Sequence, residues 1–423
     1  MESFGNKIRL IISDSDLRKK ILFVAFALFV FRLGANIPIP GVNLERLGDF
    51  FEGSQFLGLL NIFSGGGLAN LSIFMLGVAP YITATIILQL LTMIFPRLKE
   101  LYHEEGEAGR RKFAQYSRLL AVPLAVMQGY GLLALLRNSG ALLSFTFFDT
   151  VVNIVVIVAG SVLLMWLGEL ISRYGIGNGV SLIIFAGIVA SLPTALSQVF
   201  FTFSPAQIPT YLAFLAAAAV IIAGVVVISE AERPIPITYA KRVRGMKLYG
   251  GVSTYLPLRV NQAGVIPIIF ALSILLFPQM IANFLSTSEN AVLLGIANVL
   301  SQVVNNIWIY GSFYFVLVFL FTYFYTAVTF DPDAIATNLQ KSGAFIPGVR
   351  PGVQTAEYIG NILYRITLVG ALFLGGIAVM PFLMQAITEN PALAIGGTGL
   401  LIVVSVVLDL IKKINAQLSM REY

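Results

Sequence analysis

The chain has 423 residues, of which 57% are apolar and only 11% are charged, and its formal net charge is +6. Soluble globular domains are about 45 to 50% apolar and about 25% charged, so this composition excludes an ordinary soluble protein and indicates an integral membrane protein. Because the sequence has no cysteine and a single histidine, His103, it excludes disulfides, thiol catalysis and metal sites built from several such ligands.

Ten apolar segments follow one another along the chain and predict transmembrane helices. The first follows a basic leader, but so many spans come after it that we interpret it as a span and not as a cleaved signal peptide. Each segment is long enough to cross a hydrocarbon core of roughly 30 Å as a helix, and none has the alternating pattern of a β-barrel strand. The segments are 20–37, 73–95, 115–137, 149–172, 179–197, 209–229, 262–285, 306–329, 362–386 and 395–414. The predicted fold class is an all-α integral membrane protein with ten transmembrane helices.

The basic residues predict the orientation of these helices. Most of the 27 lysines and arginines fall in the leader, in alternate loops such as 230–261 and 330–361, and in the tail. By the positive-inside rule, both termini and these loops are cytoplasmic. The ten spans then divide into a half comprising residues 1–200 and a half comprising residues 201–423. Five spans in each half make the halves antiparallel, as in an inverted repeat whose functional site lies between them.

A glycine-rich segment, residues 61–71, precedes the second span. It is too short to cross a bilayer and too rich in glycine and asparagine to face lipid. Irregular backbone is tolerated at membrane depth only where protein or a cavity surrounds it. The segment is therefore either a re-entrant element or an ordinary external loop. It is not a nucleotide-binding loop, because no Gly-Lys-Ser/Thr follows its glycines.

The predicted spans contain few ionisable residues. Glu169 and Asp409 lie near cytoplasmic helix ends, and each precedes a basic residue by four positions, Arg173 and Lys413. That spacing predicts ion pairs along one helix face. Coupled transporters and intramembrane enzymes keep ionisable groups deep in the membrane. The scarcity of ionisable residues in the predicted spans therefore argues against both classes of protein.

Three polar residues would each need a hydrogen-bonding partner inside the membrane. They are Gln89 and Thr92 in the second span and Asn178 at the start of the fifth. Two roles are open to such residues: contacts that hold helices together, or a gate whose hydrogen bonds break when it opens.

Five motifs together closely resemble the bacterial SecY family, the central subunits of the general protein-export channel, and the match runs from the leader to the last span. The motifs lie at 64–91 (SGGGLAN through LQLL), 104–112 (EEGEAGRRK), 175–179 (GIGNG), 263–267 (AGVIP) and 341–352 (KSGAFIPGVRPG). The resemblance implies two inverted halves around an hourglass pore, without a cofactor or a metal. It implies a channel that passes unfolded preproteins across the membrane and releases apolar segments sideways into the bilayer.

The resemblance also assigns roles to particular residues. The pore ring would consist of Val78, Ile82, Val180, Ile184, Ile269 and Ile402. The plug, a short re-entrant helix, would comprise Ile62, Phe63, Ser64, Gly65, Gly66, Gly67, Leu68, Ala69 and Asn70. The polar positions of a lateral gate would be Gln89, Thr92 and Asn178. A ring of aliphatic side chains resists ions and offers a passing chain no hydrogen bonds.

The two large basic loops predict partner contacts. The 230–261 loop alternates around Arg244, which predicts a hairpin. Its basic residues Lys241, Arg242, Arg244 and Lys247 could meet ribosomal RNA, an acidic motor protein or anionic lipid. In the second loop, Arg350 matches the arginine that the family uses toward the SecA ATPase.

The resemblance implies SecE, and often SecG, as companion subunits, and SecA or the ribosome as the source of driving force. Preprotein signal sequences and membrane lipid are the other implied partners. The competing interpretation is a secondary small-solute transporter with the same inverted-repeat plan. A transporter of that kind would need polar or charged ligands at the membrane midplane, where this sequence offers aliphatic residues.

Overall fold

The computed structural model describes residues 13–41, 61, 64–68, 70–103, 105–138, 146–201, 208–239, 242–244, 247–249, 253–286, 290–388 and 391–419. The chain forms two compact units. The first comprises Met1–Ala216, Leu272–Tyr310 and Pro381–Tyr423, and the second comprises Ala217–Ala271 and Gly311–Met380.

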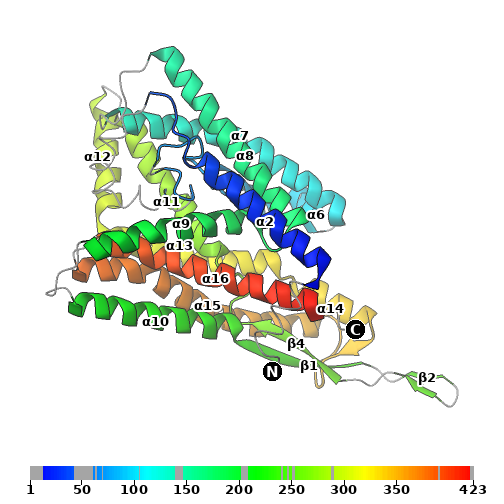
Figure 1. Ribbon diagram of the computed structural model, residues 1–423. Helices are drawn as coiled ribbons and strands as arrows, with labels where there is room; N and C mark the ends of the chain where they lie inside the picture. The colour runs from blue at the N-terminus through cyan, green and yellow to red at the C-terminus, as the bar shows by residue number, and fades with distance from the viewer. Residues whose placement is uncertain are drawn as a thin grey trace. The chain divides into compact units, whose positions relative to one another are not determined.

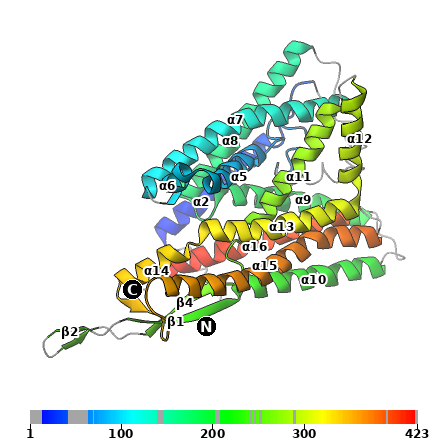
Figure 2. The same ribbon diagram turned by 180° about the vertical axis from the view of Figure 1, so that it is seen from behind.

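Helices make up the first unit. They are α2 (Ser15–Gly34), α5 (Ala79–Ile94), α6 (Pro96–His103), α7 (Gly106–Asn138), α8 (Phe147–Tyr174), α9 (Gly179–Phe201), α12 (Ala291–Asn305) and α16 (Pro391–Ser419). Helix α9 packs against α16 (Figure 1), and α7 packs against both α5 and α8 (Figure 2). Side chains form N-caps at several helices. At α2, Asp14 accepts a hydrogen bond from the N–H of Asp16 at 2.9 Å, and at α8, Thr146 and Asp149 form a capping box.

Four further helices contribute residues to both units: α10 (Ile208–Glu230), α11 (Ile266–Leu285), α13 (Ile307–Thr329) and α15 (Val353–Thr388). The second unit also contains α14 (Pro332–Lys341) and a small sheet. Strand β1 (Glu232–Tyr239) pairs antiparallel with β4 (Ser253–Arg259) on one side and with β5 (Ala344–Phe345) on the other. Strands β2 (Arg242–Arg244) and β3 (Lys247–Tyr249) form a separate hairpin beyond them (Figure 2).

Each of the ten predicted spans overlaps one of these helices, which confirms a mostly helical, multi-pass membrane protein. Within the described residues, four helices are long and apolar enough to cross a membrane: Gly106–Arg137, Phe147–Tyr174, Ile307–Lys341 and Val353–Leu383. A fifth candidate is the pair Ala79–Ile94 and Pro96–Tyr102, which is bent by 117°. The count of ten spans and the division into two inverted halves therefore stay predictions.

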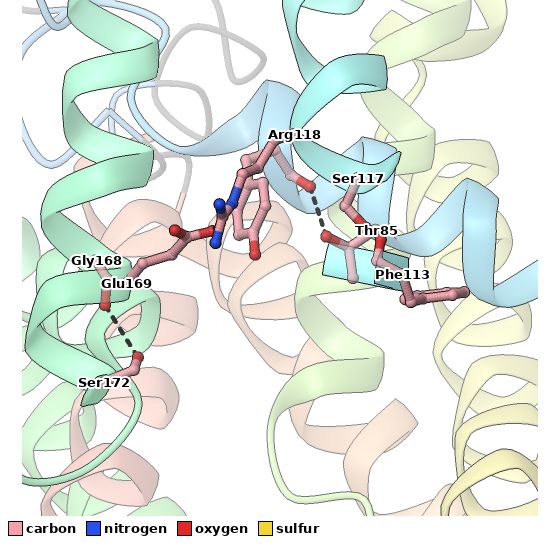
Figure 3. A network of polar contacts seen from close by, with 8 residues as sticks. Thr85, Phe113, Ser117, Arg118, Gly168, Glu169 and Ser172 are labelled. Carbon is pink, nitrogen blue, oxygen red and sulfur yellow. Dashed lines mark hydrogen bonds and ion pairs between the residues drawn. The ribbon is translucent and has the colours of Figure 1, made fainter. Parts of the chain in front are cut away.

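One of the two predicted ion pairs is confirmed and the other is wrong. Asp409 pairs with Lys413 at 2.7 Å, as the spacing predicts. Glu169 instead accepts from Nε of Arg118, on the neighbouring helix α7, at 2.7 Å (Figure 3). Arg173 lies over the ring of Tyr174. The reason is the packing of α7 against α8, which brings a guanidinium from another helix to the carboxylate.

Candidate functional site

The glycine-rich segment before α5 forms a compact series of turns where it is described. Ser64 holds it from within: its hydroxyl donates to the carbonyl of Asn61 and accepts from the N–H of Leu68, both at 2.9 Å. Gly65 and Gly66 adopt positive φ angles of 64° and 84°, which glycine reaches without steric cost. Three of the predicted plug residues, Ile62, Phe63 and Ala69, lie outside the described residues.

The C-terminal part of this segment is anchored in the core of the first unit. Leu68 and Leu71 are both 0% exposed and belong to a cluster with residues of α7 and α8 such as Leu136 and Ile157. Asn70 donates through Nδ2 to the carbonyl of Ala35 at 3.3 Å, just beyond α2. Leu68, Asn70 and Leu71 are therefore structural anchors of the segment.

Shortening Leu68 tests this anchor. Because its side chain is fully buried, Leu68→Ala should lower the free energy of unfolding by about 2 to 5 kcal/mol, the usual cost of a large-to-small core substitution. The loss should appear as a lower thermal unfolding temperature in detergent. Leu119→Ala is the matched control, since Leu119 on α7 is 70% exposed and should tolerate the change. Equal effects of the two variants would show that Leu68 has no anchoring role.

The predicted ring residues of α5 lie at the start of that helix. Val78 caps α5, and its carbonyl accepts from the N–H of Ile82 at 3.1 Å. Both side chains are buried. The pair thus occupies one face of the first turn of α5.

Two other ring candidates lie at the same level on facing helices. The Leu410 Cδ1 atom is 3.6 Å from a Cβ position built on Gly177, and the Ile188 Cγ2 atom is 3.0 Å from one built on Gly399. The first contact joins the turn before α9 to the late part of α16, and the second joins the middle of α9 to the early part of α16, so the two helices run antiparallel. That packing brings Ile184 and Ile402 to the same height, and both side chains are fully buried.

The last two ring candidates have different surroundings. Val180 is half-buried, and its Cγ2 lies 3.3 Å from the Cβ position of Gly168 on α8. Ile269 belongs to α11 in the second unit and is buried there. A ring made of all six residues stays a prediction, in which the pair Ile184 and Ile402 has the most direct support.

The three predicted gate residues have distinct local roles. Thr92 donates to the carbonyl of Gln89 at 2.6 Å, one turn earlier in α5, so its hydroxyl is satisfied within its own helix. Gln89 is buried, and its Oε1 has no hydrogen-bonding partner in the described part of the chain. Asn178 is exposed and accepts from the N–H groups of Val180 and Ser181 at 3.1 and 3.2 Å, which is the geometry of an N-cap for α9. The gate role of all three stays a prediction.

The basic loops carry ordered structure. The hairpin predicted around Arg244 is confirmed, because Arg242 pairs with Tyr249 and Arg244 with Lys247. The predicted contact residue Lys241 lies outside the described residues. Arg350 is exposed, and its carbonyl accepts from the Thr355 hydroxyl at 2.8 Å. Its loop packs on the sheet through a cluster that includes Ile235, Leu258, Ile346, Val349 and Ile359.

The sequence interpretation missed two residues that the structure makes prominent. Arg118 joins α7 to α8 through Glu169, and the Tyr81 side chain of α5 also hydrogen-bonds to Glu169. Gly187 on α9 lies directly against Gly65. A glycine in the middle of an apolar helical run was a visible signal for the second residue, whereas nothing local in the sequence pointed to the first.

Comparisons with known proteins identify the family of this chain. The SecY family model matches residues 72–411. The protein translocase subunit SecY of Mycobacterium bovis is 43% identical over 440 aligned residues, which cover 96% of each protein.

Two solved structures share the fold. One, described as showing that the plug domain of the SecY protein stabilises the closed state of the translocation channel, has a TM-score of 0.65 at 18% identity and covers 96% of this chain and 93% of that one. The other, Sec61 in the canine ribosome-channel complex, has a TM-score of 0.61 at 17% identity with the same coverage. The chain belongs to the SecY family of protein translocase subunits, and it acts as a protein-conducting channel subunit and not as an enzyme.

Proposed function

We propose that this chain forms its pore in the cytoplasmic membrane, with both termini on the cytoplasmic side, and that an aliphatic ring closes the pore around the passing polypeptide. The observation that carries the proposal is the level placement of Ile184 and Ile402 on antiparallel helices, with no ionisable side chain next to them in either sequence. An apolar constriction dewets and resists ions, and it does not bind a passing chain in any one register. A small-solute transporter would need polar ligands in that position.

The segment ending at Leu68 would act as the plug of this pore. Its turn at Gly65 lies against α9, the helix that carries Val180 and Ile184. The anchor at Leu68 and Leu71 would keep it tethered to the first unit. The description of the related SecY structure, in which the plug domain stabilises the closed state, supports this role.

The partners would be those of a translocase. We assign SecE, and SecG where present, as companion subunits, and SecA or a translating ribosome as the source of driving force. The related canine Sec61 is described in a complex with the ribosome, and the β2–β3 hairpin with Arg242, Arg244 and Lys247 offers positive charge for RNA phosphates. Signal sequences would enter the bilayer beside α5, where the buried Oε1 of Gln89 lacks a partner among the described residues.

Reconstitution tests the proposal directly. Vesicles containing this chain with SecE are supplied with SecA, ATP and a preprotein that carries a signal sequence. The expected result is preprotein protected from added protease inside the vesicles, in amounts that depend on ATP and on the signal sequence. Vesicles that protect no preprotein but accumulate a small solute would overturn the proposal. The control is a preprotein without its signal sequence, which should stay accessible to protease.

A further inference from the structure

Gly65 is enclosed between two helices of the first unit. A Cβ atom built on Gly187 of α9 would overlap Cα of Gly65 and would lie 2.5 Å from its carbonyl carbon. A Cβ atom built on Gly65 would overlap Cζ of Phe31, on α2. We call the meeting of Gly65 and Gly187 the glycine contact. Backbones approach this closely only where neither residue has a side chain.

The α2 side of the enclosure cannot move away easily. Phe31 is 1% exposed, and its ring stacks on that of Phe74 with centroids 6.2 Å apart. Phe74 in turn fills the space beside Gly34, where a Cβ atom would lie 2.6 Å from its Cζ. Because packed aromatic rings resist compression, any atom added on the α9 side must push Gly65 itself and not Phe31.

Gly187 also continues the face of α9 that carries two of the proposed ring residues. It follows Ile184 by three positions and Val180 by seven, so the three share one side of the helix. The next residue, Ile188, contacts α16 near Gly399. The missing side chain at position 187 therefore leaves a notch at the end of this aliphatic face, and the turn at Gly65 occupies it.

We propose that Gly187 is the positioning residue for the plug: its missing side chain lets the turn at Gly65 sit flush against α9, and any larger residue holds the plug partly out of place. The proposal rests on the proposed function of residues 61–68 as the plug. Its consequence is specific. Enlarging position 187 should loosen the closed state without altering the moving segment, the ring or the partner-binding loops.

The test measures ion conductance of the complete translocase complex in planar bilayers without a preprotein. Gly187→Ala should raise the conductance severalfold over the unaltered complex, and Gly187→Val should raise it further because the larger side chain displaces Gly65 more. Gly295→Ala is the matched control. Gly295 is also a helical glycine of the first unit, but no atom lies within 4 Å of a Cβ built on it, so conductance should not change. Unchanged conductance in both position-187 variants would overturn the proposal.

A double variant separates an effect through the plug from one on the pore wall. When Gly187→Ala is combined with deletion of residues 62–67, the conductance should equal that of the deletion alone, because no plug remains to displace. A further increase in the double variant would overturn the proposal. If the deletion alone leaves conductance unchanged, the plug function itself fails. If the deletion raises conductance and Gly187→Val does not, only the assignment of Gly187 fails.

A labelling measurement covers the case in which the valine variant does not assemble. The chain contains no cysteine, so Ser64→Cys introduces a single reactive thiol at a position that is 0% exposed. In the Gly187→Ala background this thiol should react severalfold faster with a water-soluble maleimide than in the unaltered background. Equal reaction rates in the two backgrounds would overturn the proposal.

Discussion

Deleting residues 62–70 is expected to raise the resting ion conductance of the reconstituted channel severalfold. The physical reason is that an aliphatic constriction alone can rewet, whereas a segment resting against α9 excludes water from the space beside it. Conductance in planar bilayers, recorded without a preprotein, measures the effect. Unchanged conductance in an assembled complex would remove the plug role from this segment.

The anchor at Leu68 decides how that experiment must be controlled. Deletion of 62–70 removes both the turns at Ser64 and Gly65 and the fully buried Leu68, so a leak could come from a weakened core instead of a missing plug. The shorter deletion 62–67 keeps Leu68. It should raise conductance as much as the longer deletion does, and should retain more of the thermal stability. A leak that appears only with the longer deletion would point to the core.

The sequence was sufficient to predict the features of this fold that depend on local composition. Apolar runs located a helix at every predicted span, and the alternation around Arg244 located the hairpin. These features follow from hydrophobic burial and from backbone pairing between neighbours in sequence. Helix ends were predicted less well: α15 begins at Val353, well before its predicted span, because its first turns are polar and pack beside the sheet.

Features that depend on contacts between distant residues could not be predicted in the same way. The partner of Glu169 is on another helix, and its identity follows from the packing of α7 against α8. Strand β5 has only two residues, too few for any periodic signal, and it joins the sheet because the second loop folds back onto β1. The resemblance to the family identified the candidate ring residues. Only the antiparallel packing of α9 and α16 brings Ile184 and Ile402 to one level.

Reversing the charge of Arg350 is expected to reduce motor-driven export at least tenfold while leaving assembly of the complex intact. Arg350 is exposed, and its backbone is held by the Thr355 hydroxyl in a loop that packs on the sheet, so its side chain is accessible and does not contribute to the core. Placing like charges together across an interface costs several kcal/mol, and about 1.4 kcal/mol corresponds to a tenfold loss of affinity. Protease-protected preprotein and SecA ATPase activity measure export; the yield of purified complex measures assembly.

Two variants show whether position 350 itself matters. Arg233→Glu makes the same charge change at another exposed residue, on β1, and should export nearly as well as the unaltered chain. Arg350→Lys keeps the charge but loses the planar fork of the guanidinium, so export should fall between the two. If Arg233→Glu were as harmful as Arg350→Glu, the contact would depend on total charge. Equal loss of export and assembly in Arg350→Glu would instead mean that the turn holding Arg350 supports the fold and does not bind the motor.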